Sequence, residues 1–141
     1  MEKKGHRVRV QTTYRSSRRQ DLMYNLNQLG QQMNITQQST NAKGGTSCHN
    51  HTANGKPSSY AIDIWGYTFG PEINISKKFQ TKHAAFFKDL GKEAKRLGLG
   101  WGGDFKQYTK SGQPKSLWTH YGLGWDPPHV YDKRCAFDKT T

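Results

Sequence analysis

The sequence predicts an α+β domain. Alternating, β-branched residues at 8–14 and 60–65 indicate strands, whereas the stretches 17–29 and 76–97 repeat their apolar residues at helical intervals. The order is strand, helix, loop, strand, helix and further strands, which is typical of an α+β domain. With 141 residues, the chain is expected to form a single domain over 1–141 with one modest core.

The first strand and the first helix are neighbours in the sequence. The strand is expected over 8–14 and runs up to Arg15. A helix follows, because Ser17 stands three residues before Gln20 in the spacing of a capping box, and leucines then recur until Gly30. Arg15 is therefore expected at a junction between a strand and a helix.

A long polar segment separates this helix from the second strand. Residues 31–57 are rich in Gln, Asn, Thr, Ser and Gly, so we expect a loop, and loops of this length are usually functional or disordered. In the strand at 60–65, alternation places Ile62 and Ile64 on one face and Asp63 on the other. Since Asp is depleted in strands, this carboxylate needs a metal ion or a basic residue as its partner.

The clearest helix is expected over 76–97, with Gly98 as its stop. Its apolar stripe consists of Phe79, His83, Phe86, Phe87, Leu90, Ala94 and Leu97. A Gly-rich segment follows at 99–105, and we expect the last strands within 118–130.

The composition narrows the class of protein. A formal net charge of +12 implies attraction to polyanions such as nucleic acid, anionic lipid or the acidic polymers of a bacterial envelope, although the same charge could serve only solubility. We expect no transmembrane segment, because no apolar run approaches the roughly 18 to 20 residues that span a bilayer. The stretch 1–10 has charges without an apolar run behind them, so we expect no signal peptide.

The chain contains two cysteines, Cys48 and Cys135, which are too few for a disulfide framework in a domain of this size. Cys48 stands beside His49, so the two thiols could be zinc ligands, or they could form a single bridge. We favour a third interpretation, in which they are unrelated thiols.

Three short blocks, far apart in the sequence, supply candidate metal ligands. They are Ser47-Cys48-His49, Ala61-Ile62-Asp63 and Asp126-Pro127-Pro128-His129. Two imidazoles and one carboxylate would leave the fourth position of a zinc ion open, which is the arrangement of catalytic zinc. The prolines favour a polyproline-like conformation that would bring Asp126 and His129 to the same side, where Asp126 could act as a base. Each block alone also has an ordinary interpretation, namely a surface turn for the last one and an exposed loop histidine for His49 or His51.

The blocks resemble motifs of the zinc peptidases of bacterial cell-wall metabolism, a family that includes D-alanyl-D-alanine carboxypeptidases and bacteriophage L-alanyl-D-glutamate endopeptidases. The family pattern is Ser-x-His, then Ala-x-Asp, and late in the chain an acidic residue three positions before a final His. Two further blocks are similar to family segments: Tyr14-Arg15-Ser16 followed by Gln20, and Leu99-Gly100-Trp101-Gly102-Gly103-Asp104-Phe105. The resemblance covers roughly residues 8 to 131, and five blocks in order are more specific than any one of them.

The resemblance implies a small domain like those of these peptidases and of the hedgehog amino-terminal domain, with a central antiparallel sheet and flanking helices. It also implies a zinc ion held by His49, Asp63 and His129. Asp126 would accept the proton of the attacking water, and Arg15 would hold a substrate carboxylate or stabilise the oxyanion.

Three further site residues follow from the same resemblance. Ser47 and Trp101 would contact the substrate, and Asp104 would lie just behind the metal ligands.

One departure from the family pattern concerns the spacing of the first two ligands. His49 and Asp63 are fourteen residues apart instead of the family's common seven, so 50–59 would be an inserted loop. The insertion makes His51 a rival ligand, but His49 has Ser47 two positions before it, as the family pattern requires.

The function implied by the resemblance is hydrolysis of peptidoglycan stem peptides, with the L-alanyl-D-glutamate bond preferred over the D-alanyl-D-alanine bond. The chain looks like a phage endolysin that is made in the host cytoplasm, is attracted to the anionic bacterial envelope and acts on the cell wall, in the periplasm, after its release. We expect a monomer without a specific nucleic-acid partner.

Two rival functions remain. The first is a basic nucleic-acid-binding domain, in which the charge and the aromatic residues would serve phosphates and bases. The second is a module without enzymatic activity, built around a closed structural zinc site of Cys48, His49 or His51, His129 and Cys135.

Overall fold

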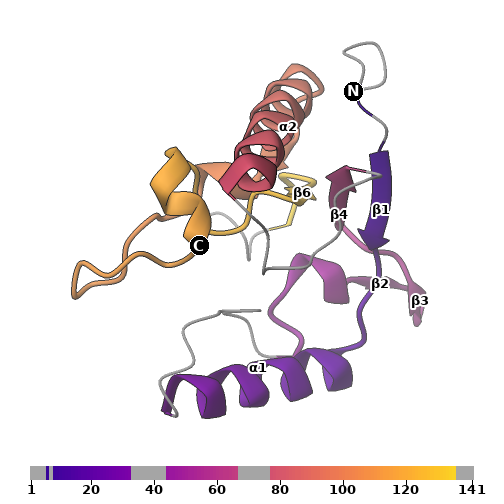
Figure 1. Cartoon of the computed structure of the whole chain (residues 1–141). Helices are drawn as coiled ribbons and strands as arrows, with labels where there is room; N and C mark the ends of the chain where they lie inside the picture. Colours follow the sequence, from indigo (N-terminus) through magenta and orange to yellow (C-terminus); the bar gives the residue numbers. More distant parts are fainter. Residues whose placement is uncertain (1–5, 7, 33–43, 67–76, 136–141) are drawn as a thin grey trace.

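A four-stranded antiparallel sheet, in the order β1-β4-β6-β5, forms the centre of the fold (Figure 1). Its strands are β1 (Val8–Thr12), β4 (Ala61–Gly66), β5 (Gly100–Trp101) and β6 (His129–Tyr131). This is a computed structural model, and the structure describes residues 6, 8–32, 44–66 and 77–135. The sheet and its two helices confirm the predicted α+β domain with a central antiparallel sheet.

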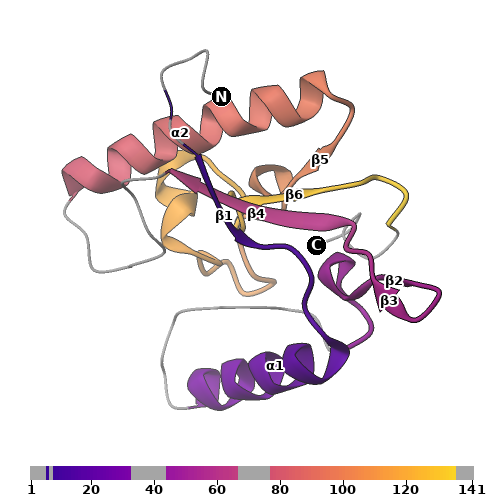
Figure 2. The ribbon, with the colours of Figure 1, turned by 90° about the vertical axis from the view of Figure 1, so that its right-hand side faces the viewer.

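The helices lie on opposite sides of the molecule. Figure 2 shows α2 (Lys77–Arg96) running along the sheet, while α1 (Ser17–Gln32) lies apart from it, beyond the end of β1. Short 3₁₀ turns connect these elements: η2 (Cys48–Asn50), η3 (Gly102–Asp104) and η4 (Leu117–Tyr121). None of the helices within the described residues is both long and apolar enough to cross a membrane.

The main core lies between α2 and the sheet. Its buried side chains are Ala84, Phe86, Phe87, Leu90, Ala94, Trp101, Trp118, Leu123 and Val130. The apolar stripe of α2 thus does what its periodicity predicts from His83 to Ala94. The side chain of Phe79 lies outside the described residues.

The predicted stripe of α2 fails at its last member. Leu97 is 60% exposed, because the helix already ends at Arg96. The N–H groups of Gly98 and Leu99 donate to the carbonyl oxygens of Lys95 and Ala94, and Gly98 has a φ of +76°. This is a Schellman motif, in which glycine takes the left-handed conformation that turns the chain out of the helix.

The beginning of α1 differs from the prediction. The Oγ atom of Ser16, not that of Ser17, accepts the N–H of Arg19 at 3.1 Å and so caps the helix. The side chain of Gln20 is fully buried and accepts a hydrogen bond from Arg15, instead of capping the backbone. The predicted capping box is therefore wrong, and Gln20 packs toward the strand-to-helix junction.

The middle of α1 also departs from the amphipathic prediction. Leu22 and Leu26 are each 58% exposed, since α1 does not lie against the sheet (Figure 2). The helix continues through Gly30 to Gln32, so Gly30 does not end it.

The polar segment predicted as a loop contains regular structure. Besides η2, it includes the hairpin of β2 (Thr52–Ala53) and β3 (Lys56–Pro57), whose turn is made by Asn54 and Gly55, both with positive φ. This hairpin lies within the expected insertion at 50–59. Residues 33–43 of the predicted loop lie outside the described residues.

The two cysteines form a disulfide, so the prediction of unrelated thiols is wrong. Cys48 and Cys135 are 87 residues apart in the sequence, but their Cα atoms lie 5.9 Å apart in the fold. A bridged cysteine offers no thiolate to a metal ion. The closed structural zinc site built from these cysteines is therefore excluded while the bridge is intact.

Candidate metal centre

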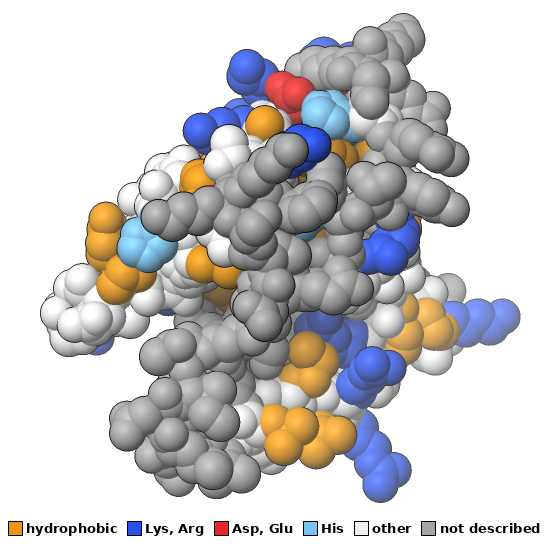
Figure 3. All heavy atoms as spheres, in the orientation of Figure 1, with side chains coloured by type: hydrophobic (Ala, Val, Ile, Leu, Met, Phe, Trp, Pro, Cys, Tyr) orange, Lys and Arg blue, Asp and Glu red, His pale blue; other side chains and the backbone are white. Residues whose placement is uncertain are grey.

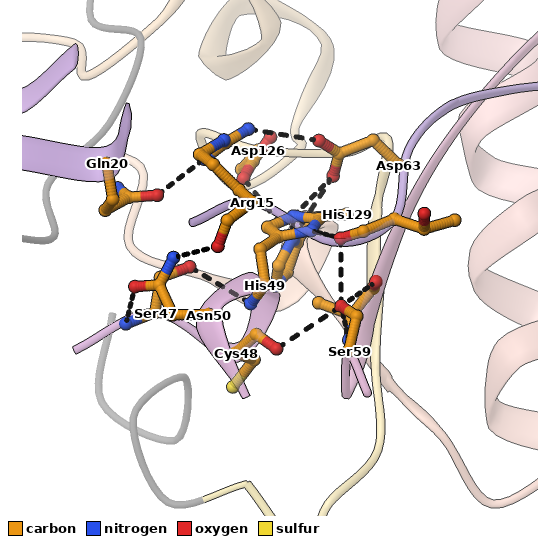
Figure 4. Close-up of polar contacts among 12 residues, drawn as sticks. Arg15, Gln20, Ser47, Cys48, His49, Asn50, Ser59, Asp63, Asp126 and His129 are labelled. Carbon is orange, nitrogen blue, oxygen red and sulfur yellow. Dashed lines mark hydrogen bonds and ion pairs between the residues drawn. The ribbon is translucent and has the colours of Figure 1, made fainter. Parts of the chain in front are cut away.

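Three side chains converge between the sheet and η2 (Figure 4). Nε2 of His49 lies 3.2 Å from Nδ1 of His129 and 3.3 Å from Oδ1 of Asp63, and Nδ1 of His129 lies 3.2 Å from the same oxygen. Within the described part of the chain, this is the one group of His, Cys, Asp and Glu side chains close enough to share a metal ion.

The register of two neighbouring strands brings Asp63 and His129 together. β4 pairs with β6 so that Asp63 stands directly opposite His129, and opposed residues project to the same face of a sheet. Ile62 and Ile64 pack against the main core on the other face. The prediction that Asp63 points away from these two isoleucines is confirmed.

His49 comes from η2, a turn whose polar groups are bonded to their neighbours. Oγ of Ser47 accepts the N–H of His49 at 3.2 Å, and Oδ1 of Asn50 accepts the N–H of Ser47 at 3.1 Å. The N–H of Arg15 donates to the carbonyl of His49 at 2.9 Å, and Nδ2 of Asn50 donates to the carbonyl of Arg15 at 2.8 Å. These bonds tie η2 to the segment between β1 and α1 and fix His49 beside the sheet.

The second ring nitrogen of His49 fixes its tautomer. Nδ1 lies 2.6 Å from the carbonyl oxygen of Thr13, and a carbonyl oxygen can only accept, so Nδ1 carries a proton. In the neutral ring, Nε2 then turns a lone pair toward Asp63 and His129. Metal-binding histidines commonly donate their other N–H to such a carbonyl.

The donor set fits a zinc ion. Nε2 of a neutral His49 and Oδ1 of an ionised Asp63 are both acceptors, yet they face each other at 3.3 Å, which calls for a cation between them. Zinc bonds of about 2.0 to 2.1 Å in a tetrahedron give ligand separations of about 3.3 Å. The three observed separations, 3.2, 3.2 and 3.3 Å, match this value.

The carboxyl group of Asp63 is ionised in this setting. Burial raises its pKa, but the contacts of its carboxylate with the imidazoles of His129 and His49 outweigh burial and hold the pKa below its usual range. The ionised carboxylate is the form that binds a metal ion.

Asp126 lies at the edge of this group. Its Oδ2 is 3.9 Å from Nδ1 of His129, and its side chain is 28% exposed, compared with 5% for His129. The two side chains lie near each other, but not through the predicted polyproline conformation. The chain makes a turn instead, closed by a 3.1 Å hydrogen bond from the N–H of His129 to the carbonyl of Asp126.

Neighbouring segments hold this turn from two sides. Nε1 of Trp101 donates to the carbonyl of Pro127 at 2.7 Å, and the N–H of Ile64 donates to that of Pro128 at 2.9 Å. Gly102 lies so close to the first carbonyl of the turn that a Cβ atom would overlap with it. The Gly-rich segment therefore serves to position the turn that carries Asp126.

Arg15 borders the group on the side of the two aspartates (Figure 4). Its Nη1 donates to Oε1 of Gln20 at 2.8 Å, and its Nη2 lies 4.0 Å from Oδ2 of Asp63, with 12% of the side chain exposed. Burial lowers the pKa of Arg15, and the charges of Asp63 and Asp126 oppose this effect. A guanidinium remains charged at neutral pH, so the group has a fixed positive charge beside it.

Three further predicted site residues are not among the ligand atoms: two support the segments around them and one lies at the surface. Ser47 and Trp101 are 6% and 7% exposed, and their polar atoms are bonded to the segments that carry His49 and Asp126, respectively. Asp104 does not lie behind the ligands: its side chain is 54% exposed, and its Oδ1 pairs with Nζ of Lys95 at 3.1 Å. Asp104 ends η3, and the close packing of the two preceding glycines leaves it at the surface.

The structure brings His49, and not His51, to the group. Nδ1 of His51 lies 2.6 Å from the carbonyl of Ser58, and its ring stacks on Tyr60 with a centroid distance of 3.7 Å. His51 is therefore part of the support of the β2–β3 hairpin.

Sequence reasoning did not assign a role to Asn50 or to the Thr13 carbonyl. In the sequence, Asn50 is notable only as the residue after His49, but in the structure its amide joins η2 to Arg15. The Thr13 carbonyl acts through its backbone, for which a single sequence carries no signal.

Comparison with known families gives a match over most of the chain. The model of a family described as "VanY: D-alanyl-D-alanine carboxypeptidase" matches residues 1–118, which is well over half of the 141 residues. The matched region contains His49 and Asp63 and ends before Asp126 and His129. No curated protein matches the chain significantly.

Proposed function

Since the chain belongs to the VanY family of D-alanyl-D-alanine carboxypeptidases, we propose that it hydrolyses peptidoglycan stem peptides with a zinc ion held by His49, Asp63 and His129. The observation that carries the proposal is the triangle of three ligand atoms at zinc-like separations, with a partly exposed carboxylate and a guanidinium at its edge. We propose that residues 1–141 act as one peptidase domain and as a monomer.

The zinc ion would supply Lewis acidity, polarising the scissile carbonyl and making an attacking water more acidic. Among the chain's own groups, Asp126 is the candidate general base. Its carboxylate is the more exposed neighbour of the ligand group and so can meet both water and substrate. In this role it accepts the proton of the attacking water and then donates it to the leaving amine.

Arg15 is the candidate for substrate recognition. Both candidate bonds join an acyl group to the nitrogen of a D-residue that carries a free α-carboxylate, either D-glutamate or a terminal D-alanine. A guanidinium can hold such a carboxylate with two parallel hydrogen bonds. The hydrogen bond that Nη1 donates to Oε1 of Gln20 fixes one end of the guanidinium and leaves Nη2 on the side of Asp63.

Replacement of Arg15 by Lys is expected to impair turnover markedly, although the charge is kept, because an ammonium cannot reproduce the planar fork of a guanidinium. The measurement is kcat/KM on a soluble stem peptide, together with the zinc content. Arg18→Lys is the matched control, since Arg18 is exposed at the start of α1. If Arg15→Lys had the kcat/KM of the parent protein, Arg15 would have a structural role and no part in substrate recognition.

We propose the L-alanyl-D-glutamate bond as the target, as the sequence resemblance implies, and the D-alanyl-D-alanine bond as the second candidate, which the family description favours. Digestion of purified peptidoglycan, with mass analysis of the fragments, distinguishes them. The first bond yields new D-glutamate amino termini, whereas the second releases free D-alanine. Products that are the same with and without a chelator would contradict the zinc-dependent reaction.

We further propose that the protein serves as a phage endolysin, with its basic surface drawing it to the anionic envelope. The net charge of +12 supports this proposal. So does the Cys48–Cys135 disulfide, because disulfides persist in oxidising compartments, such as the periplasm in which the wall is reached.

The attraction to the envelope predicts a salt effect that depends on the substrate. Raising the salt from low to a few hundred millimolar is expected to weaken lysis of whole envelopes much more than cleavage of a soluble stem peptide, since exposed charges are screened beyond about 10 Å at 0.1 M. The measurement compares both rates over the same salt series. Equal sensitivity would show that the charge does not target the wall, and tight DNA binding at physiological salt would instead favour the nucleic-acid-binding alternative.

A further inference from the structure

We infer that the Cys48–Cys135 disulfide makes the metal centre dependent on an oxidising compartment, so that the centre holds its ion tightly only after the bridge has closed. The inference rests on the metal site proposed above.

The bridge joins the two segments that carry the imidazoles. Cys48 directly precedes His49 in η2, and Cys135 follows β6, which begins at His129. Figure 4 shows Cys48 next to His49, below the ligand group. A covalent link between these segments limits how far the two imidazoles can separate.

Buried contacts surround the bridge. Cys48 is 0% exposed and Cys135 is 5% exposed, and they form a small second core with Ala61, against which Tyr60 and Tyr131 pack. This second core is separate from the main core beneath α2. The region behind the metal ligands therefore depends for its apolar packing mainly on the disulfide and the residues that contact it.

Hydrogen bonds connect the same region to both imidazole-bearing segments. The carbonyl of Cys48 accepts the N–H of Tyr60 at 3.0 Å, and the carbonyl of Tyr60 accepts the N–H of Asp132 at 2.7 Å. Tyr60 precedes β4, and Asp132 follows β6. A shift of Cys48 on reduction is thus transmitted to His49 directly and to the end of β6 through Tyr60.

A metal site is sensitive to such shifts, because its ligand atoms must stay within a narrow range of distances. Loss of groups that only orient the ligands typically weakens metal affinity by about 10-fold to 100-fold. We expect a loss of this size when the bridge is absent, since the hydrogen bonds to Thr13 and Arg15 still hold His49 on its other side.

The closing reaction is a thiol–disulfide exchange. Two thiols, on Cys48 and Cys135, react with a small disulfide or with the disulfide of an oxidoreductase; two electrons and two protons pass to the oxidant, which becomes two thiols. The cytoplasm keeps thiols reduced, whereas the bacterial periplasm favours disulfides. A hydrolase made inside the cell would therefore hold zinc weakly until it reaches the compartment of its substrate.

The test compares zinc affinity with and without the bridge, by competition with a chromophoric chelator. We expect the Cys48→Ala/Cys135→Ala variant to bind zinc about 10-fold to 100-fold more weakly than the oxidised parent protein. Alanine is chosen because it adds neither a thiolate ligand nor a buried polar group. Treatment with a thiol-free phosphine reductant is expected to weaken zinc binding by the parent protein and to leave the variant unchanged, which controls for direct effects of the reductant.

Failure of this inference is distinguishable from failure of the proposed function. Equal zinc affinity of the oxidised parent protein and the variant would overturn the inference and leave the metal site standing, whereas an oxidised parent protein without zinc binding would overturn the site itself. If the variant does not fold, the inference is tested by a redox titration of the zinc-loaded parent protein that follows both zinc release and far-ultraviolet circular dichroism. Zinc release before the loss of far-ultraviolet circular dichroism supports the inference, and release only together with global unfolding contradicts it.

Discussion

Replacing Asp126 by Asn is expected to leave one zinc ion bound per chain while lowering turnover by about 100-fold to 10,000-fold. The amide keeps the shape of the carboxylate but cannot accept the proton of an attacking water, and general-base catalysis typically contributes a factor of about this size. Oδ2 of Asp126 lies 3.9 Å from Nδ1 of His129, and the Asp126 side chain is the more exposed of the two. The measurement is kcat on a soluble stem peptide together with zinc content.

Asp104→Asn is the matched control for this experiment. Asp104 belongs to another block of the same sequence resemblance, and its carboxylate is exposed and paired with Lys95. The control is therefore expected to retain both zinc and turnover. Loss of zinc in Asp126→Asn would make Asp126 a ligand, and retained turnover would remove it from the chemistry.

Replacing His129 by Ala is expected to abolish both zinc binding and hydrolysis. The substitution removes one of three protein ligands and leaves the carboxylate of Asp63 opposite His49 without its second imidazole partner. Asp63→Ala is expected to behave in the same way. Zinc stoichiometry by elemental analysis, measured beside activity, checks both variants.

His51→Ala controls for the loss of an imidazole as such. Its ring bonds to Ser58 and stacks on Tyr60, away from the ligand group, so the variant is expected to keep zinc and most of its activity. If His51→Ala lost zinc while His49→Ala retained it, the ligand assignment in η2 would move to His51.

The sequence pattern predicted burial correctly for α2, a helix that packs its own apolar face against the sheet. The periodicity of α2 reports its packing directly, because the stripe residues Phe86, Phe87, Leu90 and Ala94 meet the main core before the Schellman motif ends the helix. The leucines of α1 follow a similar spacing, but Leu22 and Leu26 remain exposed. Periodicity shows which face of a helix can be buried. Whether that face meets the sheet depends, for α1, on how the connecting segments place the helix, and the residue pattern does not contain that information.

The sequence identified most of the residues that meet at the candidate site, since three blocks with metal-binding residue types occurred in a recognisable order. The structure adds the reason: Asp63 and His129 face each other across β4 and β6, and η2 brings His49 to them. A strand pairing across 66 positions and the hydrogen bonds of a single turn are tertiary features, so spacing alone could not derive them.

Residues that act through the backbone or through packing were the least predictable. Trp101 was expected to contact the substrate, but its Nε1 bonds to the turn before His129. Gly102, to which the sequence assigned no role, makes room for that turn. The disulfide was missed for a related reason: the proximity of Cys48 and Cys135 arises only when the segments around β4 and β6 have come together.

The zinc K-edge X-ray absorption spectrum of the oxidised protein, loaded with one equivalent of zinc, tests the central claim most directly. The account predicts a first shell of nitrogen and oxygen atoms at about 2.0 to 2.1 Å, with outer-shell scattering from two imidazole rings and no sulfur. The imidazole signal is expected to vanish in His129→Ala, which no longer holds the ion. A sulfur shell at about 2.3 Å, or a spectrum that does not change in His129→Ala, would contradict a centre built from His49, Asp63 and His129.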